Sequence, residues 1–260
     1  MAHVRVIPTL LLTERGVVKT VRFDDPTYIG CAINAVRVFN SNNVDELILL
    51  DIEATGAGRT PDPVQVREIC DESLMPVAVG GGLEDIEGVR EMLACGADKV
   101  VLNTRAIEHP EFVGECAARF GSQCVVVSLD VRSSEGFHEV LTRRGRRATG
   151  RSVTDVAVDL AARGAGEILV NAIDRDGTWS GYDLELVRSV SEAVGIPVIA
   201  LGGAGSVEDL GRAVHEAGAS AVSAGSLFVY HGRRRGILIT FPTQDELAAV
   251  LGAENVRERV

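Results

Sequence analysis

The sequence predicts a single (β/α)8 barrel, an α/β fold, on three observations. The chain has 260 residues, which is the usual size for eight β/α units. Short apolar runs rich in β-branched residues alternate with helical patterns along the chain, as in parallel β/α units. Segments of the first half also recur in the second half. Since no linker or shift of composition divides the chain, we expect one domain over residues 1–260.

The internal repeat indicates that the barrel consists of two half-barrels. PVAVGGGLEDIEGVREMLACGADKVVLNT at 76–104 aligns with 197–226, where one residue is inserted. ELILLDIEATG at 46–56 aligns with EILVNAIDRDG at 167–177, and VIPTLLL at 6–12 aligns with VVVSLDV at 125–131. Self-similarity of this kind is typical of a duplicated supersecondary unit. We therefore expect a TIM barrel with a two-fold half-barrel repeat.

The elements follow the alternating pattern. We expect strands near 4–11, 46–51, 76–80, 98–102, 124–130, 167–172, 197–201 and 220–224. Helices are expected near 31–42, 62–73, 84–95, 109–119, 153–164, 183–194, 206–217 and 243–251. Two longer inserts follow strands 1 and 5, at 12–30 and 132–152. The second is predicted to be a hairpin, with strands at 138–142 and 146–150.

Composition and charge exclude several classes of protein. The net charge of −11 argues against a nucleic-acid partner, and no apolar run reaches the roughly 18 residues of a membrane span. The N-terminus runs straight into a strand pattern, so we expect no signal peptide. The cysteines are odd in number and form no CxxC pair, which predicts free thiols in the cytoplasm: Cys31, Cys70, Cys95, Cys116 and Cys124. The histidines show no metal-ligand spacing, and we expect no metal or cofactor.

Glycine-rich turns follow strands 3 and 7, at 80–82 and 202–205. Equivalent turns after strands 4 and 8 carry Thr104 and Ser226. Glycines let the backbone approach a ligand, and the N–H groups of a helix start attract anions. Because the pattern occurs twice, we expect a ligand with two phosphates across the mouth. The alternative is that the glycines only make tight turns.

One carboxylate stands out at the end of strand 5. Asp130 is expected to point into the barrel, where a desolvated carboxyl group can act as a general acid or base. The alternative is a loop-capping aspartate. The repeat aligns Asp130 with Leu11, so a two-carboxylate mechanism has lost one partner.

A mixed set of charges lies at the opposite ends of the strands. Arg5, Glu46, Lys99 and Glu167 begin strands 1, 2, 4 and 6. Pointing inward, they would form a ring whose members must pair with one another; otherwise they are exposed rim residues. The chain has 24 arginines and only two lysines, Lys19 and Lys99, and a compact ammonium is not interchangeable with a guanidinium.

A second basic group surrounds the turn of the predicted hairpin. It comprises Arg143, Arg144, Arg146 and Arg147. The first interpretation is a solvated hairpin tip, and the alternative is an anion site.

These motifs resemble a known family. RVIP, GVVK, DELILLDI, VGGG, GADKV, LNT, FGSQ, RGAGEIL, IDRDGTWSGYD and GGAG are together similar to HisF, the cyclase subunit of imidazole glycerol phosphate synthase, over essentially the full length. The resemblance implies a barrel that pairs with a HisH-like glutaminase at its N-terminal face. Ammonia would pass through the charged gate and react with a bis-phosphorylated aminoimidazole carboxamide ribonucleotide.

The resemblance also implies roles for particular residues. Asp130 and Lys19 would be catalytic, with Lys19 on a mobile loop over the substrate. The gate would be formed by Arg5, Glu46, Lys99 and Glu167, and Asp98 would face the glutaminase. Gly82, Asn103 and Thr104 would bind one phosphate, and Gly177, Gly203, Gly225 and Ser226 the other, with Asn171 and Asp176 also at the substrate.

Three positions depart from the family pattern. Leu11 replaces the other catalytic aspartate, Leu201 a small hydroxyl residue, and Asn171 a threonine. With PTYIG and SLFVYHG, they are similar to HisF-like paralogues of sugar amidation systems, which are thought to work with an N-acetyl sugar amidotransferase in polysaccharide biosynthesis. The first hypothesis is therefore an ammonia-supplying synthase (lyase-type) subunit for sugar amidation. The alternatives are an authentic histidine-pathway cyclase and a non-catalytic, phosphate-binding scaffold for the glutaminase.

Overall fold

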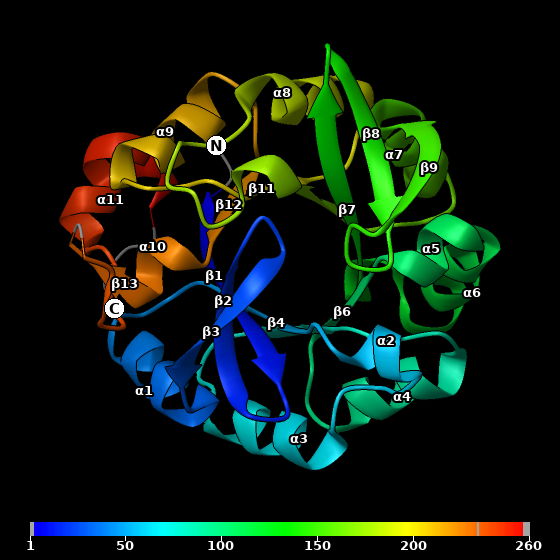
Figure 1. Ribbon diagram of the computed structural model, residues 1–260, viewed down its shortest axis with the longest axis horizontal. Coiled ribbons are helices and arrows are strands. Elements are labelled where there is room, and N and C mark those ends of the chain that lie inside the picture. Colours follow the sequence, from blue (N-terminus) through cyan, green and yellow to red (C-terminus); the bar gives the residue numbers. More distant parts are fainter. Residues whose placement is uncertain (1–2, 233, 257–260) are drawn as a thin grey trace.

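Eight parallel strands close into a barrel, which confirms the predicted fold (Figure 1). The computed structural model describes residues 3–232 and 234–256. Neighbouring strands pair in the order β10, β11, β12, β1, β4, β5, β6, β7, and β7 pairs with β10 to close the barrel. The strands are β1 (Arg5–Thr13), β4 (Leu47–Asp51), β5 (Val77–Gly80), β6 (Lys99–Leu102), β7 (Val125–Ser134), β10 (Glu167–Ala172), β11 (Val198–Leu201) and β12 (Ala221–Ala224).

Helices surround the barrel, and the eight predicted ones are present within a few residues. They are α1 (Ala32–Ser41), α3 (Pro63–Glu72), α4 (Ile86–Ala94), α6 (Glu111–Phe120), α7 (Val153–Ala162), α8 (Leu184–Ala193), α9 (Val207–His215) and α11 (Gln244–Leu251). Most begin at a capping side chain that accepts a hydrogen bond from a free N–H group of the first turn. Asp62, Asp85, Ser152 and Asp183 cap in this way, and Ser206 and Thr243 form capping boxes with the acidic residue at N3.

Several short elements are not predicted by the sequence. The helices α2 (Ala54–Ala57), α5 (Thr104–Glu108) and α10 (Ser226–Val229) follow β4, β6 and β12 at the C-terminal face. A small ladder joins β13 (Tyr230–His231) to β14 (Gly236–Ile237). Three single 3-10 turns lie at Ser122–Cys124, Ile173–Arg175 and Ala253–Asn255. Elements of two to five residues are too short to show a helical or strand period, so the pattern could not reveal them.

Both long inserts are β-hairpins that extend strands of the barrel over its C-terminal mouth (Figure 1). β8 (Phe137–Thr142) and β9 (Arg147–Ser152) continue the sheet from β7, which confirms the predicted hairpin. β2 (Gly16–Val21) and β3 (Asp24–Gly30) form a second hairpin paired with β1, which was not predicted. Most of β3 is exposed, so its sequence DDPTYIG lacks the alternation that marks a half-buried strand.

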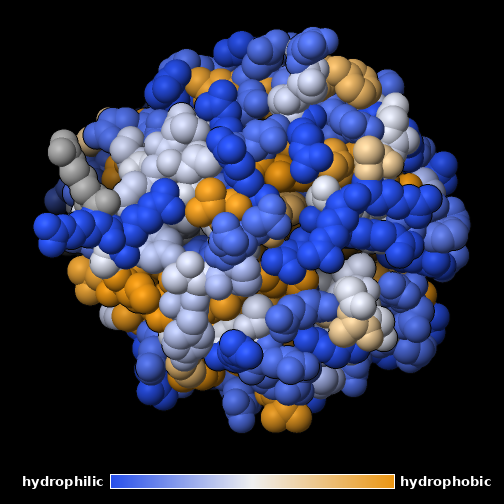
Figure 2. All heavy atoms as spheres, in the orientation of Figure 1, coloured by the Kyte–Doolittle hydropathy of each residue, from blue (hydrophilic) through white to orange (hydrophobic). Residues whose placement is uncertain are grey.

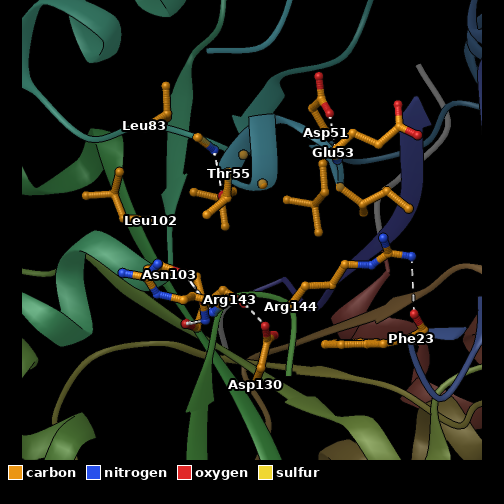
Figure 3. Close-up of a pocket in the computed structure, with 18 of the residues that line it drawn as sticks. Phe23, Asp51, Glu53, Thr55, Leu83, Leu102, Asn103, Asp130, Arg143 and Arg144 are labelled. Atoms are coloured by element: carbon orange, nitrogen blue, oxygen red, sulfur yellow. Dashed lines mark hydrogen bonds between the residues drawn. The ribbon is translucent and has the colours of Figure 1, made fainter. Parts of the chain in front are cut away.

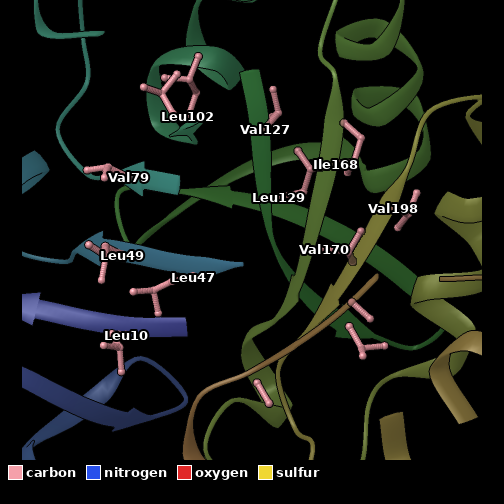
Figure 4. Packing of buried hydrophobic residues seen from close by; sticks show 14 of the residues in the cluster. Leu10, Leu47, Leu49, Val79, Leu102, Val127, Leu129, Ile168, Val170 and Val198 are labelled. Carbon is pink, nitrogen blue, oxygen red and sulfur yellow. The ribbon is translucent and has the colours of Figure 1, made fainter. Parts of the chain in front are cut away.

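The core has two parts, as expected for a barrel surrounded by helices. The larger part lies between strands and helices and contains Leu10, Leu49, Leu129 and Val170 (Figure 4). The smaller part fills the barrel interior, with Ile7, Ile48, Val126, Leu169 and Ile199 among its members. Side chains alternate in direction along a strand, so inward positions of β7 and β10 continue to Asp130 and Asn171.

Two further observations concern the described residues. No helix in this part of the chain has the length and apolar character needed to cross a membrane. All five cysteines are free thiols, as predicted.

Candidate functional site

A cavity of about 620 Å³ opens at the C-terminal mouth of the barrel (Figure 3). Its volume is in the range typical of small-molecule sites. Apolar side chains of β1, β4 and β6 line it at Leu11, Leu50 and Val101, and the polar side chains of Asp130 and Asn171 line it on the other half of the barrel. The internal repeat aligns Leu11 with Asp130 and Leu50 with Asn171. At these aligned positions the first half-barrel therefore presents apolar side chains and the second half-barrel polar ones.

Asp130 has the geometry of a general acid or base. Its carboxyl group is only 8% exposed and accepts long hydrogen bonds of 3.5 Å from Ser128 Oγ and Asn171 Nδ2. Burial raises the pKa of Asp130 to about 7, while Asn171 and Ser128 oppose the shift and Asp176 adds to it. A carboxyl group with this pKa can hold or release a proton near neutral pH.

Asn171 carries an unsatisfied polar atom in the cavity wall. The side chain is 6% exposed, and its Oδ1 has no hydrogen-bond partner among the described residues. A buried acceptor without a partner is costly, and an N–H or O–H group of a ligand would satisfy it. Asn171 was predicted at the substrate by resemblance, but its free acceptor could not be read from the sequence.

The first predicted phosphate set lies together at the cavity. Gly82, Asn103 and Thr104 all line it. Gly82 has a φ of 61°, and an added Cβ would collide with the carbonyl oxygen of Arg59. The Thr104 hydroxyl donates to Asn103 Oδ1 at 3.2 Å and accepts from the Arg143 N–H at 3.0 Å.

The second predicted set does not line this cavity. An added Cβ on Gly177 would collide with the Thr20 carbonyl oxygen of β2, and the Gly203 carbonyl accepts from the Gly181 N–H at 2.9 Å. Gly225 lies against the Lys19 ammonium, and Ser226 is buried. Asp176, near this set, accepts a hydrogen bond of 2.9 Å from Thr20 Oγ1. The β2–β3 hairpin therefore covers this side of the mouth, and only the first set faces the cavity.

Lys19 lies on the strand β2, within the segment that the resemblance implies is a mobile loop over the substrate. Its ammonium group is buried and donates a hydrogen bond to the Thr9 carbonyl oxygen. Burial lowers the pKa of Lys19 to about 8, with Asp176 opposing the shift. Burial likewise raises the pKa of Asp176, and Lys19 opposes that. Lys19 is thus held at the rim of the barrel interior and does not line the cavity.

At the N-terminal ends of the strands, the four predicted charges form a closed ring of ion pairs. Arg5 binds Glu46 at 2.5 Å and Glu167 at 3.0 Å, and Lys99 binds the same two carboxylates at 2.9 Å each. The side chains are 4% to 22% exposed, so they are not freely solvated rim residues. Burial would raise the pKa of Glu167, but Arg5 and Lys99 together hold it below its ordinary value.

Asp98 is exposed beside this ring, and its carboxylate also binds the backbone of a neighbouring strand. Its Oδ2 accepts a hydrogen bond of 2.8 Å from the Val77 N–H. Asp45 binds the Val6 N–H in the same way at 2.9 Å. Both aspartates therefore satisfy an N–H group at the start of another strand, β5 for Asp98 and β1 for Asp45.

The basic cluster is at a hairpin tip, as predicted, but all four arginines line the cavity. Arg143, Arg146 and Arg147 are exposed and Arg144 is half-buried. Arg144 Nη2 donates to the Phe23 carbonyl oxygen at 3.2 Å (Figure 3), so the tips of the two hairpins meet across the mouth. The preferred interpretation of a merely solvated tip missed this placement, because the sequence alone does not say where a hairpin leans.

Asp130→Asn is expected to stabilise the fold at alkaline pH. The folded-state pKa of about 7 lies above the ordinary 3.8, so the folded chain binds the extra proton between these values. The wild-type free energy of unfolding therefore falls as pH rises through this window, by up to about 4 kcal/mol. The variant should gain stability over wild type at pH 8 and little at pH 4, measured by thermal unfolding. Asp71→Asn, on the exposed surface of α3, is the control; an equal gain for both variants would contradict burial as the cause.

Comparisons with known proteins identify the family of the chain. A family model described as histidine biosynthesis protein matches residues 5–234. A relative from Pseudomonas aeruginosa, provisionally named imidazole glycerol phosphate synthase subunit hisF2, is 44% identical over 248 residues, covering 95% of this chain and 99% of its own. A provisionally named HisF of Leptospira interrogans is 40% identical over 252 residues, covering 96% and 99%. Imidazole glycerol phosphate synthase subunit HisF of Hyphomonas neptunium is 46% identical over 228 residues, covering 88% and 90%. The chain therefore belongs to the histidine biosynthesis protein family and, within it, to the HisF proteins.

Proposed function

We propose that the chain is the synthase subunit of a glutamine amidotransferase. In this proposal a HisH-like glutaminase docks at the N-terminal face, beside Asp98, and releases ammonia at the ring of Arg5, Glu46, Lys99 and Glu167. The ammonia crosses the barrel and reacts with a phosphorylated substrate in the C-terminal cavity. The observation that carries the proposal is the placement of a closed, paired charge ring at one end of the barrel and a buried acid at the other.

The chemistry of the interior supports the transfer of neutral ammonia. Apolar side chains such as Ile48 and Leu169 separate the ring from the cavity. An ammonium ion would lose its hydration there without a partner, whereas NH₃ is small and uncharged. Beyond this layer, Asp130 can take a proton from the attacking nitrogen or give one to a leaving group. Asn171 Oδ1 can accept an N–H hydrogen bond at the same place.

The phosphorylated substrate would be held at the first glycine set. Gly82 and Thr104 lie at the cavity rim, with the arginines of the β8–β9 hairpin beside them. The apolar floor formed by Leu11 and Leu50 suits the uncharged part of such a ligand.

We further propose that the chain supplies nitrogen for sugar amidation in polysaccharide biosynthesis. An N-acetyl sugar amidotransferase would then transfer this nitrogen to the acceptor sugar. Leu11 removes one of the two carboxylates that ring closure to the imidazole would use. The relatives also divide by length of alignment. The family model ends at residue 234 and the Hyphomonas subunit aligns over 228 residues, whereas the hisF2 relative and the Leptospira protein align over 248 and 252. The longer alignment with the hisF2 relative supports this part of the proposal.

The docking of the glutaminase can be tested directly. Co-purification of the chain with a HisH-like glutaminase from the same genome should give a one-to-one heterodimer by light scattering, and Asp98→Arg should weaken it at least tenfold. Reversal of an interfacial charge typically costs a few kcal/mol. Arg132→Glu, on the opposite face, reverses a charge without touching this surface and is the matched control. A heterodimer unaffected by Asp98→Arg, or no heterodimer with wild type, would contradict the proposed docking face.

The two alternatives predict different outcomes. An authentic cyclase would close the imidazole ring at a normal rate despite Leu11. A scaffold would bind the glutaminase and a phosphorylated ligand but would incorporate no nitrogen from ammonium into any acceptor.

A further inference from the structure

We propose that the arginines of the β8–β9 hairpin form an oxyanion site adjoining Thr104, so that the ligand carries two neighbouring oxyanions, as a diphosphate does. The proposal deepens the proposed function, since it concerns the phosphorylated ligand of the same cavity. We call Arg105, Arg143, Arg144, Arg146 and Arg147 the arginine wall; all five line the cavity.

The arginine wall is not neutralised by the carboxylates around it. Glu108 is shared by Arg143, at 3.0 and 3.1 Å, and Arg147, at 3.1 Å. Arg144 binds only the uncharged carbonyl of Phe23. Within the described residues, the Arg146 guanidinium has neither a hydrogen-bond nor an ion-pair partner. At the hairpin tip, Glu108 is therefore the carboxylate that pairs directly with guanidinium groups, and it pairs with two of the four. Glu84, which also lines the cavity, acts on Arg143 at longer range without a hydrogen bond.

Arg105 contributes an unsatisfied donor beneath the tip. Its Nε is buried and has no hydrogen-bond partner among the described residues. The guanidinium lies over the ring of Phe112, at 5.6 Å from the ring centre, which holds the side chain against the wall of the cavity. An incoming oxyanion would supply the missing acceptor, and the cost of a buried, unpaired donor would be removed.

Two further acidic side chains lie on the opposite wall. Asp51 is bound by Arg59 at 2.6 Å, and Glu53 lies beside it, across the cavity from Arg143 and Arg144 (Figure 3). Figure 2 shows hydrophilic side chains gathered beside the mouth, over the region of the β8–β9 hairpin. The arginines that line the cavity come from α5 and the β8–β9 hairpin, whereas Asp51 and Glu53 come from the opposite wall.

The hairpin turn is strained in a way that brings the arginine wall to the phosphate residues. Arg143 and Arg144 have φ values of 55° and 60°, in the left-handed region that non-glycine residues rarely adopt. This backbone directs the Arg143 N–H to Thr104 Oγ1. An anion bound at Thr104 would thus lie next to the guanidinium groups.

The opposite rim offers less room for a second oxyanion. Gly177 is packed against the backbone of β2, and Lys19 lies against Gly225. A second oxyanion is better placed beside the first, where planar guanidinium groups can bind it in bidentate fashion. This is why the geometry points to adjacent oxyanions rather than to phosphates on opposite sides.

Titration calorimetry with inorganic phosphate and inorganic pyrophosphate, in magnesium-free buffer, tests the arginine wall. Wild type should bind pyrophosphate at least about tenfold more tightly than phosphate. Arg146→Gln and Arg105→Gln should each weaken pyrophosphate binding by about tenfold, the equivalent of one charge-assisted contact, and affect phosphate binding less. Arg132→Gln is the matched control, because Arg132 does not line the cavity and is half exposed.

Each outcome decides for or against the arginine wall. Equal affinity for the two anions in wild type would overturn it. So would unchanged pyrophosphate affinity in Arg146→Gln and Arg105→Gln, or an equal loss in Arg132→Gln, which would indicate only an effect of net charge. Circular dichroism shows whether each variant is folded. Heterodimer formation with the glutaminase is independent of this binding, so failure here would leave the proposed function intact.

Discussion

With ammonium chloride as the nitrogen source, the wild-type chain should close the imidazole ring about 10² to 10⁴ times more slowly than a cyclase with two catalytic carboxylates. A general acid or base typically contributes a factor of this size. Asp130 supplies one such group, but Leu11 at the equivalent position of the first half-barrel cannot transfer a proton. Use of ammonium removes the glutaminase from the measurement, so the rate reports on the cavity alone.

Leu11→Asp should recover part of the lost rate. Leu11 lines the cavity and pairs with Val18 and Leu50 on the neighbouring strands. It is partly exposed, so a carboxylate there would be hydrated by cavity water and remain ionised at neutral pH. Recovery should be incomplete, because the buried side chain of Leu201 replaces a smaller residue expected there.

Leu11→Asn is the matched control, since it has the size of aspartate without its charge. Initial rates of formation of imidazole glycerol phosphate for wild type, Leu11→Asp and Leu11→Asn provide the comparison. A wild-type rate of about 1 s⁻¹ or more, within the ordinary range of enzymes, would favour the authentic cyclase. Equal recovery by Leu11→Asn would mean that the leucine side chain only obstructs the cavity.

The repeat in the sequence predicts the fold because the same pattern of strand, turn and helix occurs in both halves of the chain. It also locates the ring and the cavity floor, since residues that align, such as Glu46 with Glu167, occupy equivalent inward positions. The roles inferred for Lys19 and the second glycine set remain predictions. Lys19 lies on the β2–β3 hairpin, and this hairpin packs against Gly177 and Gly225. That hairpin could not be predicted, because its outer strand is exposed and its position depends on contacts with distant loops, such as Arg22 with Asp176.

The arginine wall shows a different limit of the sequence. Four of its five residues lie close together at 143–147 and are visible in the sequence, but their relation to Thr104 depends on the direction in which β8 and β9 lean. A left-handed turn at Arg143 decides that direction, and nothing in the residue type favours this conformation. The sequence therefore identifies the charges, and only the three-dimensional arrangement shows which surface they face.

Lys99→Ala should uncouple the two nitrogen sources in the complex with the glutaminase. Lys99 Nζ contacts both Glu46 and Glu167, so its loss leaves two partly buried carboxylates to Arg5 alone. Breaking a buried pair by removal of one partner is typically costly, because the remaining charge must hydrate or move. We expect glutamine-dependent turnover to fall at least about tenfold, while ammonium-dependent turnover changes by less than about twofold, because free ammonia enters from the open C-terminal mouth.

Lys99→Ala should also change the stability of the fold at acidic pH. Arg5 and Lys99 hold the pKa of Glu167 below its ordinary value against the effect of burial, so the ring stabilises the fold above the ordinary glutamate pKa. This stabilisation is lost as pH falls through the lowered value. Without Lys99 the pKa of Glu167 should rise, and acid unfolding should begin at a higher pH than in wild type.

The comparison requires both nitrogen sources on one preparation. Incorporation of ¹⁵N from glutamine and from ammonium is measured with the same acceptor. If turnover by the wild-type chain is too slow to measure, the Lys99 variants are compared in the Leu11→Asp protein. Lys99→Met keeps the length of the side chain without its charge, and it should resemble Lys99→Ala if charge pairing shapes the opening. Recovery by Lys99→Met would assign the effect to packing. Equal losses with glutamine and ammonium would reduce Lys99 to a structural residue, and passage of ammonia through the ring would be refuted with it.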